Sequence, residues 1–151
     1  MIASVAESQL KKLIVVKPHF ELDAVESRLA WLKHSNAEWL GWHTEDGQIS
    51  GWVLINWDGK ASLSAIPYIF DLYVLESRRG IGIGSLLLVH CERLALQRGC
   101  KQISLAVNPD LNPRAVLLYE RLGYRPVDGV KYLDGVYNGD EDWVINMIKA
   151  L

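Results

Sequence analysis

The hydrophobic positions of this chain follow two periods, one typical of helices and one typical of strands. Leu22, Val25, Leu29 and Leu32 recur at intervals of three and four residues, which predicts an amphipathic helix over residues 21–35. Two apolar segments flank residues 45–48, where an Asp-Gly pair favours the turn of a β-hairpin. Further strands are predicted at residues 13–17, 68–75, 102–107 and 142–148.

Two more helices are predicted by the residues at their ends. The first begins within the glycine-rich stretch after residue 75 and runs to about Arg98, where Gly99 is placed to end it. The second has Asn112 as its N-cap, Pro113 at its first position and Gly123 at its end. Helices that alternate with strands predict an α/β (α+β) fold, and the hairpin makes its sheet mixed.

Composition narrows the class of protein. A chain of 151 residues with 50% apolar and 23% charged residues has room for one domain with a core, so we expect residues 1–151 to form a single domain. The formal net charge of −2 argues against a nucleic-acid-binding module. Cys91 and Cys100 fit no disulfide or metal pattern, and the N-terminal residues lack the apolar run of a signal peptide or membrane span. We therefore expect a cytoplasmic protein without nucleic-acid or membrane partners.

The stretch RRGIGIGS, residues 78–85, has the features of an anion site. Its glycines allow backbone N–H groups to approach a ligand, and the helix that follows adds unpaired donors and a positive dipole end. The dinucleotide fingerprint G-x-G-x-x-G fails because Ser85 stands where its third glycine belongs. The P-loop pattern fails because no lysine follows the glycines. A phosphate or pyrophosphate ligand is therefore expected, with a tight turn that binds nothing as the alternative.

Two blocks of sequence resemble the GNAT (N-acetyltransferase) superfamily. Arg79-Gly80-Ile81-Gly82-Ile83-Gly84 is similar to its acetyl-CoA signature, and NPRAVLLYERLGY, residues 112–124, is similar to its next block. The resemblance implies the GNAT fold, which is a mixed central sheet of six to seven strands with helices on both faces. Its parallel strands, here residues 68–75 and 102–107, splay apart. It also implies transfer of an acetyl group from acetyl-CoA to a primary amine by direct attack in a ternary complex, with no metal.

The resemblance implies how the chain holds the cofactor. The backbone amides of the glycine stretch would bind the CoA pyrophosphate, and a bulge would free backbone groups of Leu72 and Val74 for the pantetheine amides and the thioester oxygen. Asn112 would contact the cofactor with its side chain, although its role as a helix cap alone would explain its presence. The predicted pyrophosphate residues are Arg79, Gly80, Ile81, Gly82, Ile83, Gly84 and Ser85.

Tyr119 is the predicted general acid, since a tyrosine with a pKa near 10 stays protonated at neutral pH and can donate to the departing thiolate. A merely packed helix residue is the alternative for Tyr119. The general base is less well defined. Asp71 is the nearest carboxylate, but strand alternation places it on the face opposite Leu72 unless the bulge redirects it. A water relay or another group is the alternative base.

The amine acceptor is not specified by the sequence. Five of the six tryptophans fall within residues 31–57, where they either line an aromatic pocket for a cationic amine or simply fill the core. The acidic residues of 138–142 are expected to form a solvated loop rather than a metal site. The resemblance is compatible with a small-molecule amine or a peptide amine as the acceptor. It is also compatible with a homodimer. Two alternatives remain, a non-catalytic acyl-CoA-binding module and a site for another phosphate ligand.

Overall fold

The structure, a computed structural model, describes residues 1–9, 22–137 and 139–151, so the strand predicted at 13–17 lies outside the described residues. Its helical elements are η1 (Glu7–Gln9), α2 (Leu22–Lys33), η2 (Glu76–Arg78), α3 (Ile83–Gln97) and α4 (Pro113–Arg121). Its strands are β1 (Ile2–Ser4), β2 (Ala37–His43), β3 (Ile49–Asn56), β4 (Gly59–Lys60), β5 (Leu63–Ser64), β6 (Tyr68–Val74), β7 (Gln102–Val107), β8 (Arg125–Pro126), β9 (Tyr132–Tyr137) and β10 (Asp140–Ala150).

Eight of these strands form one mixed sheet. Its order is β1-β2-β3-β6-β7-β10-β8, with β9 paired to β10 outside that path. Among the described strands, β6 and β7 are the one parallel pair. The mixed sheet with a parallel pair is confirmed, while the sheet has one strand more than the six to seven expected. Short edge strands account for this difference, because β1 and β8 have three and two residues and carry little periodicity.

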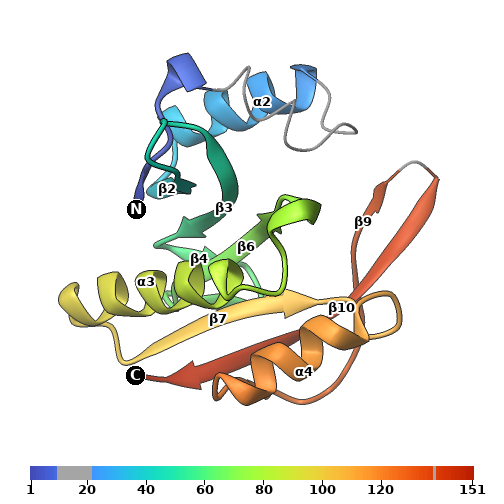
Figure 1. Cartoon of the computed structure of the whole chain (residues 1–151). Coiled ribbons are helices and arrows are strands. Elements are labelled where there is room, and N and C mark those ends of the chain that lie inside the picture. Colours follow the sequence, from blue (N-terminus) through green and yellow to red (C-terminus); the bar gives the residue numbers. More distant parts are fainter. Residues whose placement is uncertain (10–21, 138) are drawn as a thin grey trace.

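Helices cover both faces of the sheet, as predicted (Figure 1). On one face, α3 and α4 pack over a core that includes the fully buried Leu87, Leu88 and Ile103. On the other face, Leu29 and Leu32 of α2 pack against a smaller core around Trp39, Trp52 and Leu54. The sheet therefore separates two compartments, and each helix belongs to one of them.

The tryptophans mostly fill the core rather than line an amine pocket. Trp39, Trp52 and Trp57 are buried. Trp31 of α2 is 38% exposed and meets the ring of Phe70 edge-on at 5.6 Å between centroids. The interpretation that the tryptophans fill the core is therefore correct for Trp39, Trp52 and Trp57. Of these three and Trp31, only Trp31 is exposed.

Element ends agree closely with the sequence, with two corrections. Gly99 and Gly123 end α3 and α4 with φ angles of 79° and 98°, as expected for helix-ending glycines. Asn112 occupies the N-cap of α4, but its side chain makes no capping hydrogen bond. Residues 140–142 are not a solvated loop. They begin β10, because β9 provides a strand with which they can pair.

Candidate active site

The parallel strands β6 and β7 share only a short run of pairing. Tyr68 pairs with Ser104 and Ile69 with Leu105, and no further register joins the two strands. Beyond that point β6 continues along β3, while Val107 at the end of β7 pairs with Ile145 of β10. The two strands therefore splay apart toward their carboxyl ends, as predicted.

A bulge in β6 lies at the start of this splay. The register between β3 and β6 passes from Trp52↔Tyr73 to Leu54↔Phe70, so two residues of β6 face one residue of β3. Asp71 takes the left-handed conformation with a φ of 55°. Leu72 has no place in the pairing of β6 with either neighbour. Its backbone groups are therefore left for another partner, as the sequence predicted.

The carbonyl of Val74 has a partner within the chain. Arg79 donates from Nε to this oxygen at 2.8 Å, and its guanidinium lies 5.3 Å from the centroid of the Tyr73 ring. This contact fixes the head of Arg79 against β6. Any cofactor contact at Val74 has to use its side chain, its N–H group or the second lone pair of its carbonyl.

The glycine turn exposes backbone to open space. Gly80 and Gly82 have φ angles of 80° and 91°, which favour glycine over any residue with a Cβ. An ideal Cβ at either position would meet no protein atom within 4 Å, so protein packing is not what requires the glycines. Gly82 is the N-cap of α3, whose first turn contains no acidic residue. The amides of this turn and the positive end of α3 thus face open space with the polarity that suits an anion.

A groove of about 950 Å³ connects the bulge, the glycine turn and α4. It collects most of the predicted cofactor residues, which are Leu72, Val74, Arg79, Gly80, Gly82, Ile83, Gly84, Ser85, Asn112 and Tyr119. Ile81 does not line it, and its side chain is 66% exposed. Since the side chain of Asn112 does not cap α4, it remains available to the groove.

Tyr119, the predicted general acid, lies in the groove. It lines the groove together with Leu72, while its ring packs edge-on against Tyr124 at 6.2 Å between centroids. Burial raises the pKa of Tyr119 above its ordinary value, because a buried phenolate is poorly solvated. The hydroxyl therefore remains protonated through the neutral range and is able to donate.

Asp71 lies on the other side of the sheet. It does not line the groove, and its Oδ2 forms an ion pair with Nη1 of Arg28 on α2 at 3.0 Å. Strand alternation predicted this orientation opposite Leu72, and the bulge does not reverse it. The two predicted catalytic residues thus approach the splay from opposite faces, Tyr119 from the α4 side and Asp71 from the α2 side.

Charged and aromatic side chains surround Asp71 on this face. Tyr68 stacks on Phe70 with 5.4 Å between ring centroids. Lys60 lies over the rings of Tyr68 and Tyr132, at 5.0 and 4.9 Å, and forms an ion pair with Asp134 of β9. Burial of Lys60 lowers its pKa, but hydrogen bonds to Asp134 and Tyr132 outweigh that effect and raise it overall. This face therefore holds cations against aromatic rings.

Tyr137 of β9 is within the electrostatic influence of this cluster. Its pKa is raised by partial burial of the hydroxyl and by the carboxylates of Asp134 and Asp142. Arg28 and Lys60 oppose that increase, so both cations lie close enough to act on the same hydroxyl. Sequence patterns did not reveal this arrangement. Lys60, Asp134 and Arg28 come from three distant segments, and no local signal marks any of them.

Comparisons with known proteins agree with this geometry. The model of the Acetyltransferase (GNAT) family matches residues 3–124. Thialysine N-epsilon-acetyltransferase of Sus scrofa is 47% identical over 58 residues, which are 38% of this chain and 34% of that protein. The Mus musculus protein of the same name is 45% identical over 56 residues. The matched segment thus spans about a third of the length of these curated relatives.

Solved structures show the same fold. Ribosomal-protein-alanine N-acetyltransferase from Brucella melitensis superimposes with a TM-score of 0.79 at 21% identity, covering 100% of this chain and 99% of that one. A spermidine N-acetyltransferase chimera that includes Vibrio cholerae sequence gives 0.77 at 15% identity, covering 99% and 94%. Within the described residues, no helix is both long and apolar enough to cross a membrane. The family match over residues 3–124, together with the splayed strands and glycine turn, places this chain in the GNAT acetyltransferase family.

Proposed function

We propose that the protein is an N-acetyltransferase that transfers the acetyl group of acetyl-CoA to a primary amine by direct attack within a ternary complex. The groove that joins the bulge at Leu72, the glycine turn and Tyr119 carries this proposal. When bound, acetyl-CoA supplies the activated thioester. The residues present fit that ligand, because the turn presents amides without Cβ atoms and the splay leaves strand groups unpaired.

Leu72 would stabilise the negative charge that develops on the carbonyl oxygen under attack. Its N–H group lies at the bulge and is absent from both strand pairings of β6. A fixed donor aimed at such an oxygen contributes about 3 kcal/mol in other acyl-transfer enzymes. Since the donor is a backbone group, the geometry of the bulge rather than the identity of residue 72 supplies it.

The protons of the reaction would move on opposite faces of the sheet. A primary ammonium, with a pKa near 10.4, has to lose one proton before its nitrogen can attack. Asp71, on the α2 face, is the proposed acceptor of that proton, directly or through water. Tyr119, on the other face, would give its proton to the departing thiolate. The new amide bond forms as the C–S bond breaks, and the nitrogen gives up a second proton as the intermediate collapses. The nitrogen thus loses two protons, of which one replaces the proton that Tyr119 gives to the thiolate and the other leaves to solvent.

The acceptor is proposed only as a class. The names of similar proteins include a thialysine, a spermidine and a protein N-terminal alanine acetyltransferase, so a likeness of fold does not select among amines. The aromatic rings of Trp31, Phe70 and Tyr68 on the α2 face favour a cationic acceptor, because a cation is attracted to the face of an aromatic ring. Lysine, thialysine, spermidine and an alanine-starting peptide are therefore the first amines to test.

Thermal unfolding tests the ligand. Saturating CoA should raise the melting temperature, because a ligand that binds only the folded state stabilises it by mass action. ATP and NAD at the same concentration serve as controls and should produce no comparable rise. Stabilisation by ATP or NAD but not by CoA would contradict the proposal.

Release of free thiol tests the chemistry. Acetyl-CoA incubated with the protein and each amine should yield one thiol per acetylated amine, and mass spectrometry should show the product gaining one acetyl group. Tight CoA binding with no turnover on any amine would favour the alternative of a non-catalytic acyl-CoA-binding module. The retained Tyr119 and its position in the groove favour turnover.

A further inference from the structure

The charged side chains that line the groove are all arginines. Arg78, Arg79, Arg114 and Arg121 line it, and no acidic residue does. The whole chain, by contrast, carries a net charge of −2. A concentration of one sign of charge in a cleft focuses the field there and attracts an anion. The glycine turn already offers backbone donors for a pyrophosphate, so the arginines exceed what that group needs.

Of the four arginines, Arg79 is held by other contacts and Arg78 is shared with another hollow. The head of Arg79 is bound to the Val74 carbonyl and lies over Tyr73. Arg78 also borders a second hollow, which is lined by Glu45 and Asp46 among others. Arg114 and Arg121 remain. Within the described part of the chain, neither has an ion pair or hydrogen bond to another side chain.

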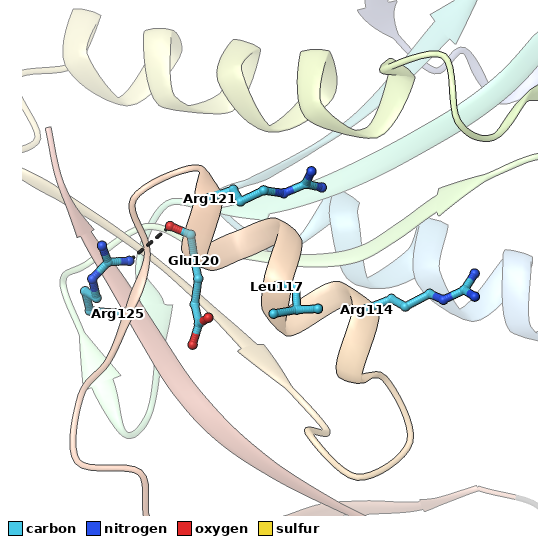
Figure 2. A pocket seen from close by; sticks show the side chains of 5 residues that line it. All are labelled: Arg114, Leu117, Glu120, Arg121 and Arg125. Carbon is cyan, nitrogen blue, oxygen red and sulfur yellow. Dashed lines mark hydrogen bonds between the residues drawn. The ribbon is translucent and has the colours of Figure 1, made fainter.

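Arg114 and Arg121 lie on one side of α4. They are seven residues apart, which is nearly two full helical turns, and so they lie on nearly the same face. Figure 2 shows both side chains extending from α4 in the same general direction; with Leu117, Glu120 and Arg125 they also line a second hollow beside this helix. Arg125 instead donates to the carbonyls of Glu120 and Tyr124. The two free guanidiniums thus flank the groove across from the glycine turn.

We propose that Arg114 and Arg121 bind the 3′-phosphate of CoA and make the protein selective for CoA over dephospho-CoA. This proposal rests on the proposed function, since it assigns the part of the same cofactor that the glycine turn does not hold. A phosphate monoester carries a charge of about −1.5 to −2 at pH 7 and offers three acceptor oxygens. The planar guanidinium binds such oxygens through two parallel hydrogen bonds.

Binding of CoA and dephospho-CoA by isothermal titration calorimetry tests this site without any knowledge of the acceptor. The unaltered protein should bind CoA at least about tenfold more tightly, which corresponds to one charge-assisted contact. Arg114→Gln and Arg121→Gln should each weaken CoA binding. The double variant should bind both ligands alike, with an affinity for dephospho-CoA close to that of the unaltered protein.

Arg93→Gln is the matched control. Arg93 is an exposed arginine in the second half of α3 and does not line the groove, so its loss changes the net charge equally. It should leave the preference for CoA unchanged, and the melting temperatures of all variants should stay close together because the three side chains are exposed. Raising the salt concentration should reduce the preference for CoA in the unaltered protein.

The outcomes separate this proposal from the proposed function. Equal binding of CoA and dephospho-CoA by the unaltered protein would overturn the 3′-phosphate site and leave the acetyltransferase proposal standing. A preference that survives in the double variant would likewise overturn the assignment to Arg114 and Arg121. If neither ligand binds the unaltered protein, the proposed function itself is wrong.

Discussion

The two faces of the sheet hold two different kinds of site. The proposed cofactor side is formed mainly by backbone, from the bulge at Leu72 and the turn through Gly80 and Gly82. The opposite side is formed by side-chain pairs, such as Arg28 with Asp71 and Lys60 with Asp134. Backbone sites need particular local conformations, whereas side-chain sites need distant segments to meet. The first kind leaves a motif in the sequence and the second does not.

The largest expected effect is a block of the backbone site. A Cβ at Gly84 would lie 3.7 Å from Val74 Cγ2 and 3.9 Å from Leu72 Cδ2, which is ordinary contact. Gly84→Val adds an isopropyl group beside these groove residues and should weaken CoA binding by about 100-fold or more, a loss of about 2.7 kcal/mol. Gly84→Ala is the matched control and should bind CoA nearly as well as the unaltered protein. Equal CoA affinity in both variants would contradict the placement of the cofactor here.

Loss of the general acid is the next largest effect. Tyr119→Phe removes one hydroxyl and keeps the ring that packs against Tyr124. We expect kcat to fall by about 100-fold, within the range of general acid catalysis, with little change in the affinity for CoA. Steady-state kinetics on the best amine and calorimetry with CoA would measure the two quantities. An unchanged kcat, with chemistry shown to be rate-limiting, would remove Tyr119 from the mechanism.

A change on the α2 face should leave the cofactor side intact. Asp71→Asn removes the proposed base and the partner of Arg28, and it should reduce kcat/KM for the amine by about tenfold or more. The affinity for CoA should not change, because Asp71 does not line the groove. Asp134→Asn breaks the other ion pair of this face and serves as the matched control, with a smaller effect on kcat/KM. Equal losses in the two variants would identify Asp71 as a structural residue only.

Alkaline pH should weaken both compartments gradually. On the α3 side, burial raises the pKa of Cys91 from 9.0 to about 12. On the α2 side, burial is the main cause that raises the pKa of Tyr68 from 10.0 to about 12. The folded state therefore binds more protons than the unfolded state between these values. Stability is fully present below pH 9 and falls as the pH rises toward 12, by about 1.4 kcal/mol per pH unit for each group.

Urea denaturation at pH 8, 9.5 and 10.5 measures this slope. Cys91→Ala should remove most of the loss between pH 9 and 10, because Tyr68 contributes only above pH 10. Tyr68→Phe should flatten the curve only in the upper part of the range. A slope in the Cys91→Ala variant equal to that of the unaltered protein would show that the thiol is not the group responsible.

The sequence by itself determined the elements whose signals are local. The ends of α3 and α4, the hairpin at 45–48 and the glycine turn each depend on the backbone preferences of a few neighbouring residues. Tyr119 could be predicted because it stands at a fixed distance from Asn112 within one motif. The position of Asp71 opposite Leu72 followed from the period of a strand, which the bulge did not reverse.

The tertiary structure alone decided which distant residues meet. The predicted strand over 142–148 extends back to residue 140 because β9 pairs with residues 140–142, and no property of residues 140 and 141 indicates it. The pairing of Arg28 with Asp71 and the placement of Lys60 over Tyr68 and Tyr132 depend on how helices and hairpins pack across the sheet. Arg114 and Arg121 look like ordinary surface residues of α4 until the groove beside them is seen. Local conformational preference determined the cofactor side, and long-range packing determined the rest.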